Sequence, residues 1–214
     1  MGAELSDAED TAGARSRSRR LLAANTVWGV VSEGTRMATA LLVFFILTAR
    51  FEIGTYGRLI GALAILHIVV PVATLGSTYL LLQRVAGEGW DRAEALSRAL
   101  GMAFASGLAA TALLMLAQPL VLPQVSIVAL GLLGVTELAL MGAVEACIFL
   151  AQATERLRTM AQIRATNGVI RLLAALILLV TTTTPDLWVW GLYYAVAAGA
   201  GLLMAQVYLL GRPL

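Results

Sequence analysis

Six long apolar segments, separated by short polar stretches, fill most of this chain. They span approximately residues 23–48, 58–82, 97–118, 125–150, 166–184 and 187–210. A helix needs about 20 largely apolar residues to cross the hydrocarbon core of a bilayer, and each segment is about that long or longer. Because backbone polar groups cannot stay unpaired in lipid, such segments fold as helices. The sequence therefore predicts an all-α, polytopic membrane protein, a bundle of six transmembrane helices.

Composition agrees with this class and argues against several others. Of the 214 residues, 59% are hydrophobic and 13% are charged, whereas soluble domains carry about 25% charged residues. The chain has one cysteine, Cys147, and one histidine, His67, which argues against a disulfide framework or a multi-histidine metal site. It has no Walker sequence, zinc-binding His-Glu-x-x-His or catalytic serine pattern. We therefore expect no enzymatic activity, no metal and no cofactor.

The first residues differ in composition from the rest. Residues 1–21 are small and acidic, then basic, with four arginines between Arg15 and Arg20. We expect a disordered basic cytoplasmic tail that lies against anionic lipid headgroups. Beside a membrane segment, this cluster is more typical of a topology anchor than of a nucleic-acid site, so no nucleic-acid partner is expected. Residues 22–214 would form the six-helix transmembrane lobe.

The arginines predict the orientation of the lobe. Of the fifteen basic residues, all arginine, eleven lie in the tail and connectors on one side, two on the other, and two at membrane depth. An excess of basic residues marks the cytoplasmic face. Both termini and the connectors at 84–98 and 154–164 are therefore predicted to be cytoplasmic. A turn at Gly54 and Gly57 is expected on the opposite side.

Two charged residues interrupt the first apolar segment. Glu33 and Arg36 lie about one helical turn apart, so their side chains can meet. A charge at the centre of a spanning helix costs about 2.5–3.5 kcal/mol on the insertion scale. Such residues therefore pair with each other, or face protein or a water-filled cavity.

Further polar residues lie at membrane depth in the first, fourth and fifth segments. They are Asn25, Glu137, Glu145, Asn167 and Arg171. In a structural interpretation, Glu33 pairs with Arg36, and Glu137 or Glu145 pairs with Arg171, so that ion pairs hold the helices together. In a functional interpretation, the arginines and asparagines bind an anionic substrate in a hydrated cavity, and the three glutamates carry a coupling proton.

The second segment contains the one histidine. Pro71 releases the backbone carbonyl of His67, four residues earlier. We expect His67 to be a satisfied interior side chain, with a role as a switch as the alternative.

Short motifs resemble those of one transporter family. The stretch Leu47–Gly57, which reads LTARFEIGTYG, resembles the Ala-Arg and Tyr-Gly signature that follows the first helix in bacterial polysaccharide and O-antigen flippases. The likeness continues in residues 75–77, 83–86 and 152–156. These flippases belong to the multidrug/oligosaccharidyl-lipid/polysaccharide exporter superfamily, and the order of spans is similar over most of residues 22–212. The turn after Arg50 lacks the usual proline, and family members have two six-helix lobes where this chain has one.

The resemblance implies a function and a location. Such a flippase moves a polyprenyl-diphosphate-linked oligosaccharide across the bacterial inner membrane by alternating access, for polysaccharide or lipopolysaccharide biosynthesis. It implies that Arg36 and Arg171 contact the diphosphate, and that a second six-helix lobe or a second copy completes the transporter. Two alternatives stay open, a small-solute or drug antiporter of the same superfamily and a non-transporting membrane subunit or fragment.

Overall fold

The computed structural model describes residues 27–74, 92–154, 156–183 and 185–210, and these form helices with no strand among them. The helices are the first helix (Val27–Arg50), α2 (Ile53–Thr74), α4 (Arg92–Val121), α5 (Ile127–Gly134), η1 (Val135–Leu140), α6 (Met141–Ala153), α7 (Leu157–Thr181) and α8 (Leu187–Leu210). Because α5, η1 and α6 follow one another without a break, they make one span. Six helices are therefore long and apolar enough to cross a membrane, which confirms the predicted fold class.

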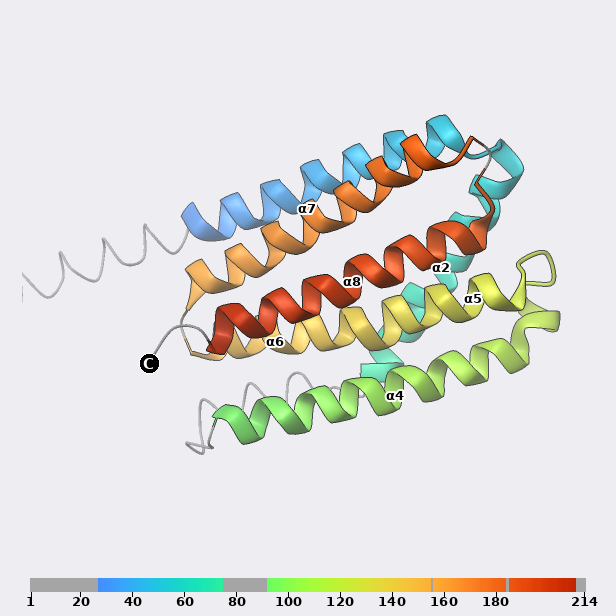
Figure 1. The fold of residues 1–214 in the computed structure, drawn as a ribbon. Helices are drawn as coiled ribbons and strands as arrows, with labels where there is room; N and C mark the ends of the chain where they lie inside the picture. The colour runs from blue at the N-terminus through green and yellow to red at the C-terminus, as the bar shows by residue number, and fades with distance from the viewer. Residues whose placement is uncertain (1–26, 75–91, 155, 184, 211–214) are drawn as a thin grey trace, which may run out of the picture.

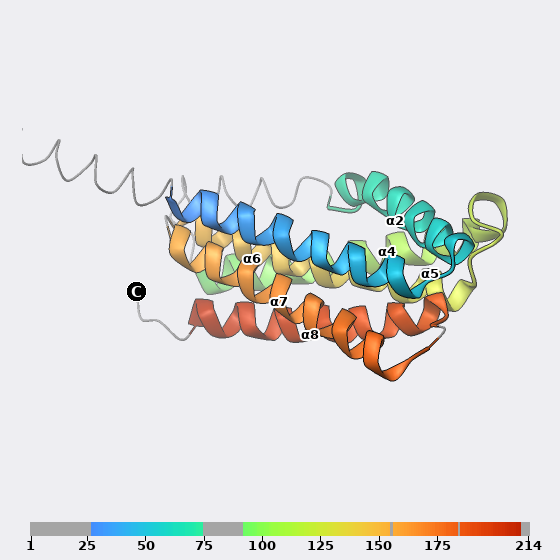
Figure 2. The same cartoon turned by 90° about the horizontal axis from the view of Figure 1, so that it is seen from above.

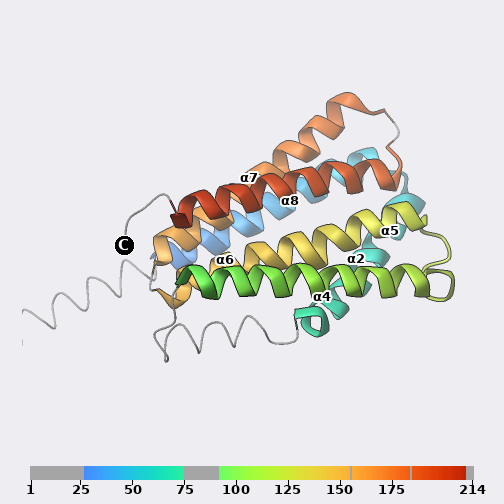
Figure 3. The same ribbon diagram turned by 60° about the horizontal axis from the view of Figure 1, so that its bottom comes forward.

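The composite helix α5–η1–α6 lies at the centre of the bundle. About half of its apolar window is buried (56%), and α8 follows at 44%, whereas each of the other four helices buries about a fifth or less. Figure 1 shows α8 between this central helix and α7, with α4 at the opposite edge. Figure 3 shows α4 running beside α5 and α6. Lipid is the natural neighbour of the apolar side chains that the outer helices leave exposed.

The first helix packs against α7 along its length and meets α2 at one end. Its contacts with α7 include those between Trp28 and Arg158, Thr39 and Gly168, and Arg50 and the carbonyl of Leu179. Its last turns enter an apolar cluster with α2 through Val43 and Leu47, and Phe51, directly after the helix, joins the same cluster. From there α2 runs away from the first helix toward α4 and η1 (Figure 2). In the other half of this helix Ser32 and Thr39 are buried on the face that Val43 continues, whereas the side chain of Arg36, between them in sequence, is 57% exposed.

The connection between these two helices is shorter than predicted, and the expected turn at Gly54 and Gly57 is wrong. Both glycines lie in α2. The backbone N–H of Phe51 donates to the Leu47 carbonyl and that of Tyr56 to the Glu52 carbonyl, each at 2.9 Å. The first bond ends the first helix and the second begins α2, so only Phe51 and Glu52 separate the two helices. A glycine costs a helix about 1 kcal/mol, which packing of the rest of α2 offsets.

The expected connector at 154–164 is also mostly wrong, because α7 begins at Leu157. Polar residues in its first turns kept this stretch out of the predicted apolar segment, yet Thr159, Met160 and Ile163 are buried there. The sixth span has the predicted bounds, Leu187–Leu210. The predicted tail and the expected end of the second span, 75–82, lie outside the described residues.

The middle of the central helix is π-helical. The Met141 N–H donates to the carbonyl of Thr136, five residues earlier, and η1 therefore contains one widened turn. Gly107 of α4 makes room for it, since a Cβ there would lie 2.4 Å from the Leu138 carbonyl oxygen. Such π segments are rare and frequently occur at functional sites. Glu137 lies within this one.

Val27 and Leu210 lie at the same end of the bundle (Figure 1), as an even number of spans requires. The side of the membrane that this end faces stays a prediction.

Candidate functional site

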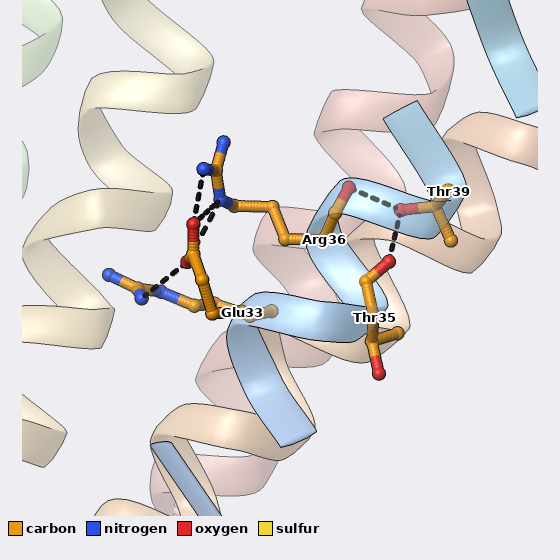
Figure 4. A network of polar contacts seen from close by, with 5 residues as sticks. Glu33, Thr35, Arg36 and Thr39 are labelled. Carbon is orange, nitrogen blue, oxygen red and sulfur yellow. Dashed lines mark hydrogen bonds and ion pairs between the residues drawn. The ribbon is translucent and has the colours of Figure 1, made fainter. Parts of the chain in front are cut away.

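The pair predicted in the first helix is formed. The Arg36 Nε donates to both carboxylate oxygens of Glu33 at 3.1 Å, and Nη2 makes a further bond to Oε1 (Figure 4). Both side chains are partly open, with 57% of the Arg36 side chain exposed. Thr39, one turn on, donates its hydroxyl to the backbone carbonyls of Thr35 and Arg36. The threonine hydroxyl is thus satisfied within the helix, and the side chains of Glu33 and Arg36 point away from Thr39 (Figure 4).

Two charged residues from other helices join this pair. The Nη1 of Arg164, on α7, lies 3.9 Å from Oε2 of Glu33. Glu145, on α6, interacts electrostatically with both Arg164 and Arg36. Two arginines and two glutamates from three helices therefore form one formally neutral group. We call these four residues, Glu33, Arg36, Glu145 and Arg164, the charge cluster.

The charge cluster lies well inside the apolar length of its helices. At about 1.5 Å of rise per residue, Arg36 lies about 13 Å from the start of the first helix at Val27. By the same measure Arg164 lies about 10 Å from the start of α7 at Leu157. In a bilayer with a hydrocarbon core of about 30 Å, charges at this depth need partners or water.

Arg171 is not paired in the way that the structural interpretation expected. Among the described residues, no ion pair joins it to Glu137 or Glu145, so that prediction is wrong. Its guanidinium lies over the ring of Tyr194 instead, 4.5 Å from the centroid. Helix rotation explains the difference, since Tyr194 of α8 lies between the arginine and Glu137. The Arg171 Nε is buried and finds no hydrogen-bond partner in the described part of the chain.

Glu137 is buried in the centre of the bundle. The Tyr194 hydroxyl donates to its Oε1 at 2.7 Å, and His67 of α2 places Nε2 at 3.9 Å from Oε2. The His67 side chain is 65% exposed and that of Glu137 is 9% exposed. The expectation that His67 is an interior side chain is therefore wrong. We call Glu137, Tyr194, Arg171 and His67 the tyrosine cluster.

Asn167 lies between the two clusters. It falls one turn after Arg164 and one turn before Arg171 on α7, and its Nδ2 donates to the Met141 sulfur at 3.5 Å. Gly201 of α8 leaves room for this amide, because a Cβ there would lie 2.3 Å from Oδ1. The polar residues of α7 thus face α6 and α8 in one continuous row. Asn25 lies outside the described residues.

The structure therefore brings three of the predicted residues together, Glu33, Arg36 and Glu145, and places Glu137, Arg171 and Asn167 along the same row. Two members were missed as site residues. Arg164 had been grouped with the connector arginines, although its spacing of three and seven residues from Asn167 and Arg171 places all three on one helix face. Tyr194 was not predicted as a site residue, since no local signal in the sequence distinguishes it from its neighbour Tyr193.

The fold and these clusters define a class, a multi-pass helical membrane protein with ionisable residues inside its apolar helices. Comparisons with models of protein families, with curated proteins and with solved structures find no significant match to this chain. The assignment of function accordingly depends on the residues themselves.

Proposed function

We propose that this chain is one lobe of a membrane transporter that moves a polyprenyl-diphosphate-linked oligosaccharide from one leaflet to the other. Arg36 and Arg171 contact the diphosphate. The other polar residues of the two clusters line the path of the diphosphate through the membrane. The motifs at residues 47–57 and 152–156, which resemble those of bacterial polysaccharide flippases, support the substrate class.

The observation that carries the proposal is the exposure of Arg36. Val43, seven residues on and close to the same helix face, is buried at 3% exposure, while 57% of the Arg36 side chain is open. Lipid offers this guanidinium no hydrogen bond and no counter-charge. Apart from its bonds to Glu33, the open part of this guanidinium therefore needs water, a second protein surface or an anionic ligand at this depth.

Arg36 and Arg171 are suited to bind a diphosphate. Arginine keeps its charge in a membrane and offers a planar fork of donors that matches phosphate oxygens. Arg36 is occupied by Glu33, so a diphosphate would take the place of that carboxylate. The buried Nε of Arg171 lacks a hydrogen-bond partner among the described residues and offers a second donor further along the same row.

A second lobe completes the proposed carrier. Substrate sites in such carriers lie between two repeats, and one six-helix bundle supplies one wall. Because the first helix begins and α8 ends at the same end of the bundle (Figure 1), a second copy or a separate lobe inserts in the same orientation. The two can then pair about an axis along the membrane normal.

Transport in proteoliposomes tests the proposal. A polyprenyl-diphosphate glycan with a fluorophore on its sugar is reconstituted with the protein, and an impermeant quencher reports the fraction in the outer leaflet. We expect Arg36→Ala to lower the initial rate by about ten- to hundredfold, the loss of one or two charge-assisted bonds. Arg98→Ala is the control, because Arg98 lies near the start of α4 and bonds Glu94.

The outcome separates the candidate functions. Wild-type rates from a stable Arg36→Ala protein would remove the binding role. Accumulation of small cations or drugs in vesicles, without movement of the lipid-linked glycan, would identify the antiporter alternative. Transport of neither substrate by protein that is paired with its second lobe would favour a non-transporting subunit.

A further inference from the structure

His67 and Glu137 form a pair that reaches from the surface of the lobe to its interior. The imidazole is mostly exposed on α2, the carboxylate is buried in η1, and their facing atoms are 3.9 Å apart. This separation is too long for a direct hydrogen bond but is spanned by one water or a small side-chain movement. On the other side of Glu137, the Tyr194 hydroxyl donates a hydrogen bond to Oε1 of this carboxylate at 2.7 Å.

We propose that His67, Glu137 and Tyr194 form a proton-binding site, in which the exposed imidazole delivers a proton to the buried carboxylate. The proposal depends on the transport function in one respect, since it names the ion that would drive that function. Proton binding itself requires no substrate.

The charged surroundings distinguish this carboxylate from Glu33. Glu33 is held by two arginines, which keep their protons at all relevant pH, so it stays ionised. Glu137 has partners that can lose or gain a proton or donate a neutral hydrogen bond. Of these two carboxylates, Glu137 is therefore the one with a neighbour that can pass a proton to it.

The helices that pack on η1 bring few other charges to Glu137. α2 contributes His67, and α8 contributes Tyr194, with Arg171 of α7 on the ring of that tyrosine. Glu145 lies eight residues along the central helix and interacts electrostatically with Arg164 and Arg36. From α4, the uncharged Gly107 and Thr111 face the central helix. In the described part of the chain, His67 is thus the titratable group placed between Glu137 and the exterior.

Both members of the pair lie where their helix is irregular. Pro71 has no N–H to donate to the His67 carbonyl one turn earlier. In η1, the Met141 N–H bonds Thr136 and not Glu137, as an α-helix would require. Of these two features, the π segment is of a kind that frequently occurs at functional sites.

The proton steps balance without a further reactant. A hydronium ion gives a proton to Nδ1 of a neutral imidazole that carries its hydrogen on Nε2, and a water molecule is left. The resulting imidazolium gives the Nε2 hydrogen to Oε2 of Glu137. A neutral imidazole and a neutral carboxylic acid remain, and the Tyr194 hydroxyl keeps its hydrogen bond to Oε1. Reversal of these steps releases the proton.

Infrared difference spectroscopy of the purified chain in nanodiscs tests this site directly, without substrate. A step in pH should produce a carboxylic-acid C=O band that Glu137→Gln abolishes and the control Glu94→Gln retains. His67→Gln, an exposed change that preserves packing, should slow the appearance of the band on the order of 100-fold.

Each result has a definite meaning. An unchanged band in Glu137→Gln would show that another group binds the proton, and a wild-type rate in His67→Gln would remove the delivery role; either result overturns the proposal. If the band behaves as expected but no lipid-linked glycan moves in proteoliposomes, the proton site stands and the transport proposal fails.

Discussion

At the residue scale, Glu33 is the carboxylate on which the charge cluster depends. It accepts from Arg36 within the first helix and lies 3.9 Å from Arg164 of α7. Glu145 interacts electrostatically with both Arg36 and Arg164. Removal of Glu33 would leave two arginines with one carboxylate at membrane depth, where each unpaired charge is costly.

We therefore expect Glu33→Gln to lower the unfolding temperature in detergent micelles more than the double change Glu33→Gln, Arg36→Gln does. The double variant restores neutrality, because Arg164 then has Glu145 as its counter-charge. Glu94→Gln, at an exposed pair one turn into α4, is the matched control and should change little. Equal destabilisation by the single and double variants would show that Glu33 and Arg36 do not act as a pair.

At the element scale, the crossing of α4 over the central helix depends on a missing side chain. A Cβ on Gly107 would lie 2.4 Å from the Leu138 carbonyl oxygen and 2.6 Å from the Ala139 Cα. Both of those are backbone atoms of η1, so neither can turn aside. The π segment and α4 therefore fit together at this glycine.

Two alanine substitutions on α4 test this crossing. Gly107→Ala should lower the unfolding free energy by about 1–3 kcal/mol, the usual cost of overpacking. Gly101→Ala, on the same helix with nothing within 4 Å of its Cβ, should raise it by about 0.5–1 kcal/mol, since alanine favours a helix over glycine. Reversible unfolding in mixed micelles measures both, and a neutral Gly107→Ala would contradict the close crossing.

The elements also show how far the sequence predicts the structure. Six spans follow from apolar length alone, and Leu187–Leu210 was predicted to the residue because a polar hairpin ends the apolar run on one side. The start of α7 was missed by nine residues, since a helix that carries arginines on one face and buried Thr159 and Met160 on another has a low average hydropathy.

The candidate site likewise contains one contact that the sequence predicts and others that it does not. The Glu33–Arg36 contact is local, three residues apart, and helical spacing predicts it. The Tyr194–Glu137 bond joins residues 57 apart, and the Arg164–Glu33 contact crosses from α7 to the first helix. Both depend on how each helix is rotated in the bundle, and the spacing of residues within one helix does not determine that rotation.

At the scale of the whole molecule, the two ends of the bundle must face opposite sides of the membrane. Gly54 and Asp186 are exposed near the starts of α2 and α8, at one end, and Gln152 is exposed near the end of α6, at the other (Figure 1). The excess of arginines predicts that the Gln152 end is cytoplasmic.

Single cysteines in a Cys147→Ala background test this orientation. Gly54→Cys and Asp186→Cys should react with an impermeant thiol reagent in intact spheroplasts, and Gln152→Cys should react after lysis. Cys147 is buried, so its replacement removes only a weak background of labelling. Labelling of Gln152→Cys in intact cells, with protection of the other two, would reverse the orientation.

Pairing of lobes gives a second prediction at this scale. Ala40 lies near the Arg36 face of the first helix and Ala38 near the opposite face, and both are exposed. We expect Ala40→Cys to form crosslinks with another copy or another lobe in native membranes, and Ala38→Cys to form few. Crosslinking of Ala38→Cys alone would show that the partner contacts the face opposite Arg36, which would contradict the prediction.

The central claim is that this chain binds a diphosphate lipid at Arg36, and photoaffinity labelling in native membranes tests it most directly. The probe is a polyprenyl-diphosphate glycan with a photoreactive group near the diphosphate, and the labelled peptides are mapped by mass spectrometry. We predict labels on the first helix and α7, loss of these labels in Arg36→Ala, and competition by unlabelled diphosphate lipid but not by a neutral polyprenol of equal length. Equal labelling of wild type and Arg36→Ala, or equal competition by the neutral lipid, would contradict the account.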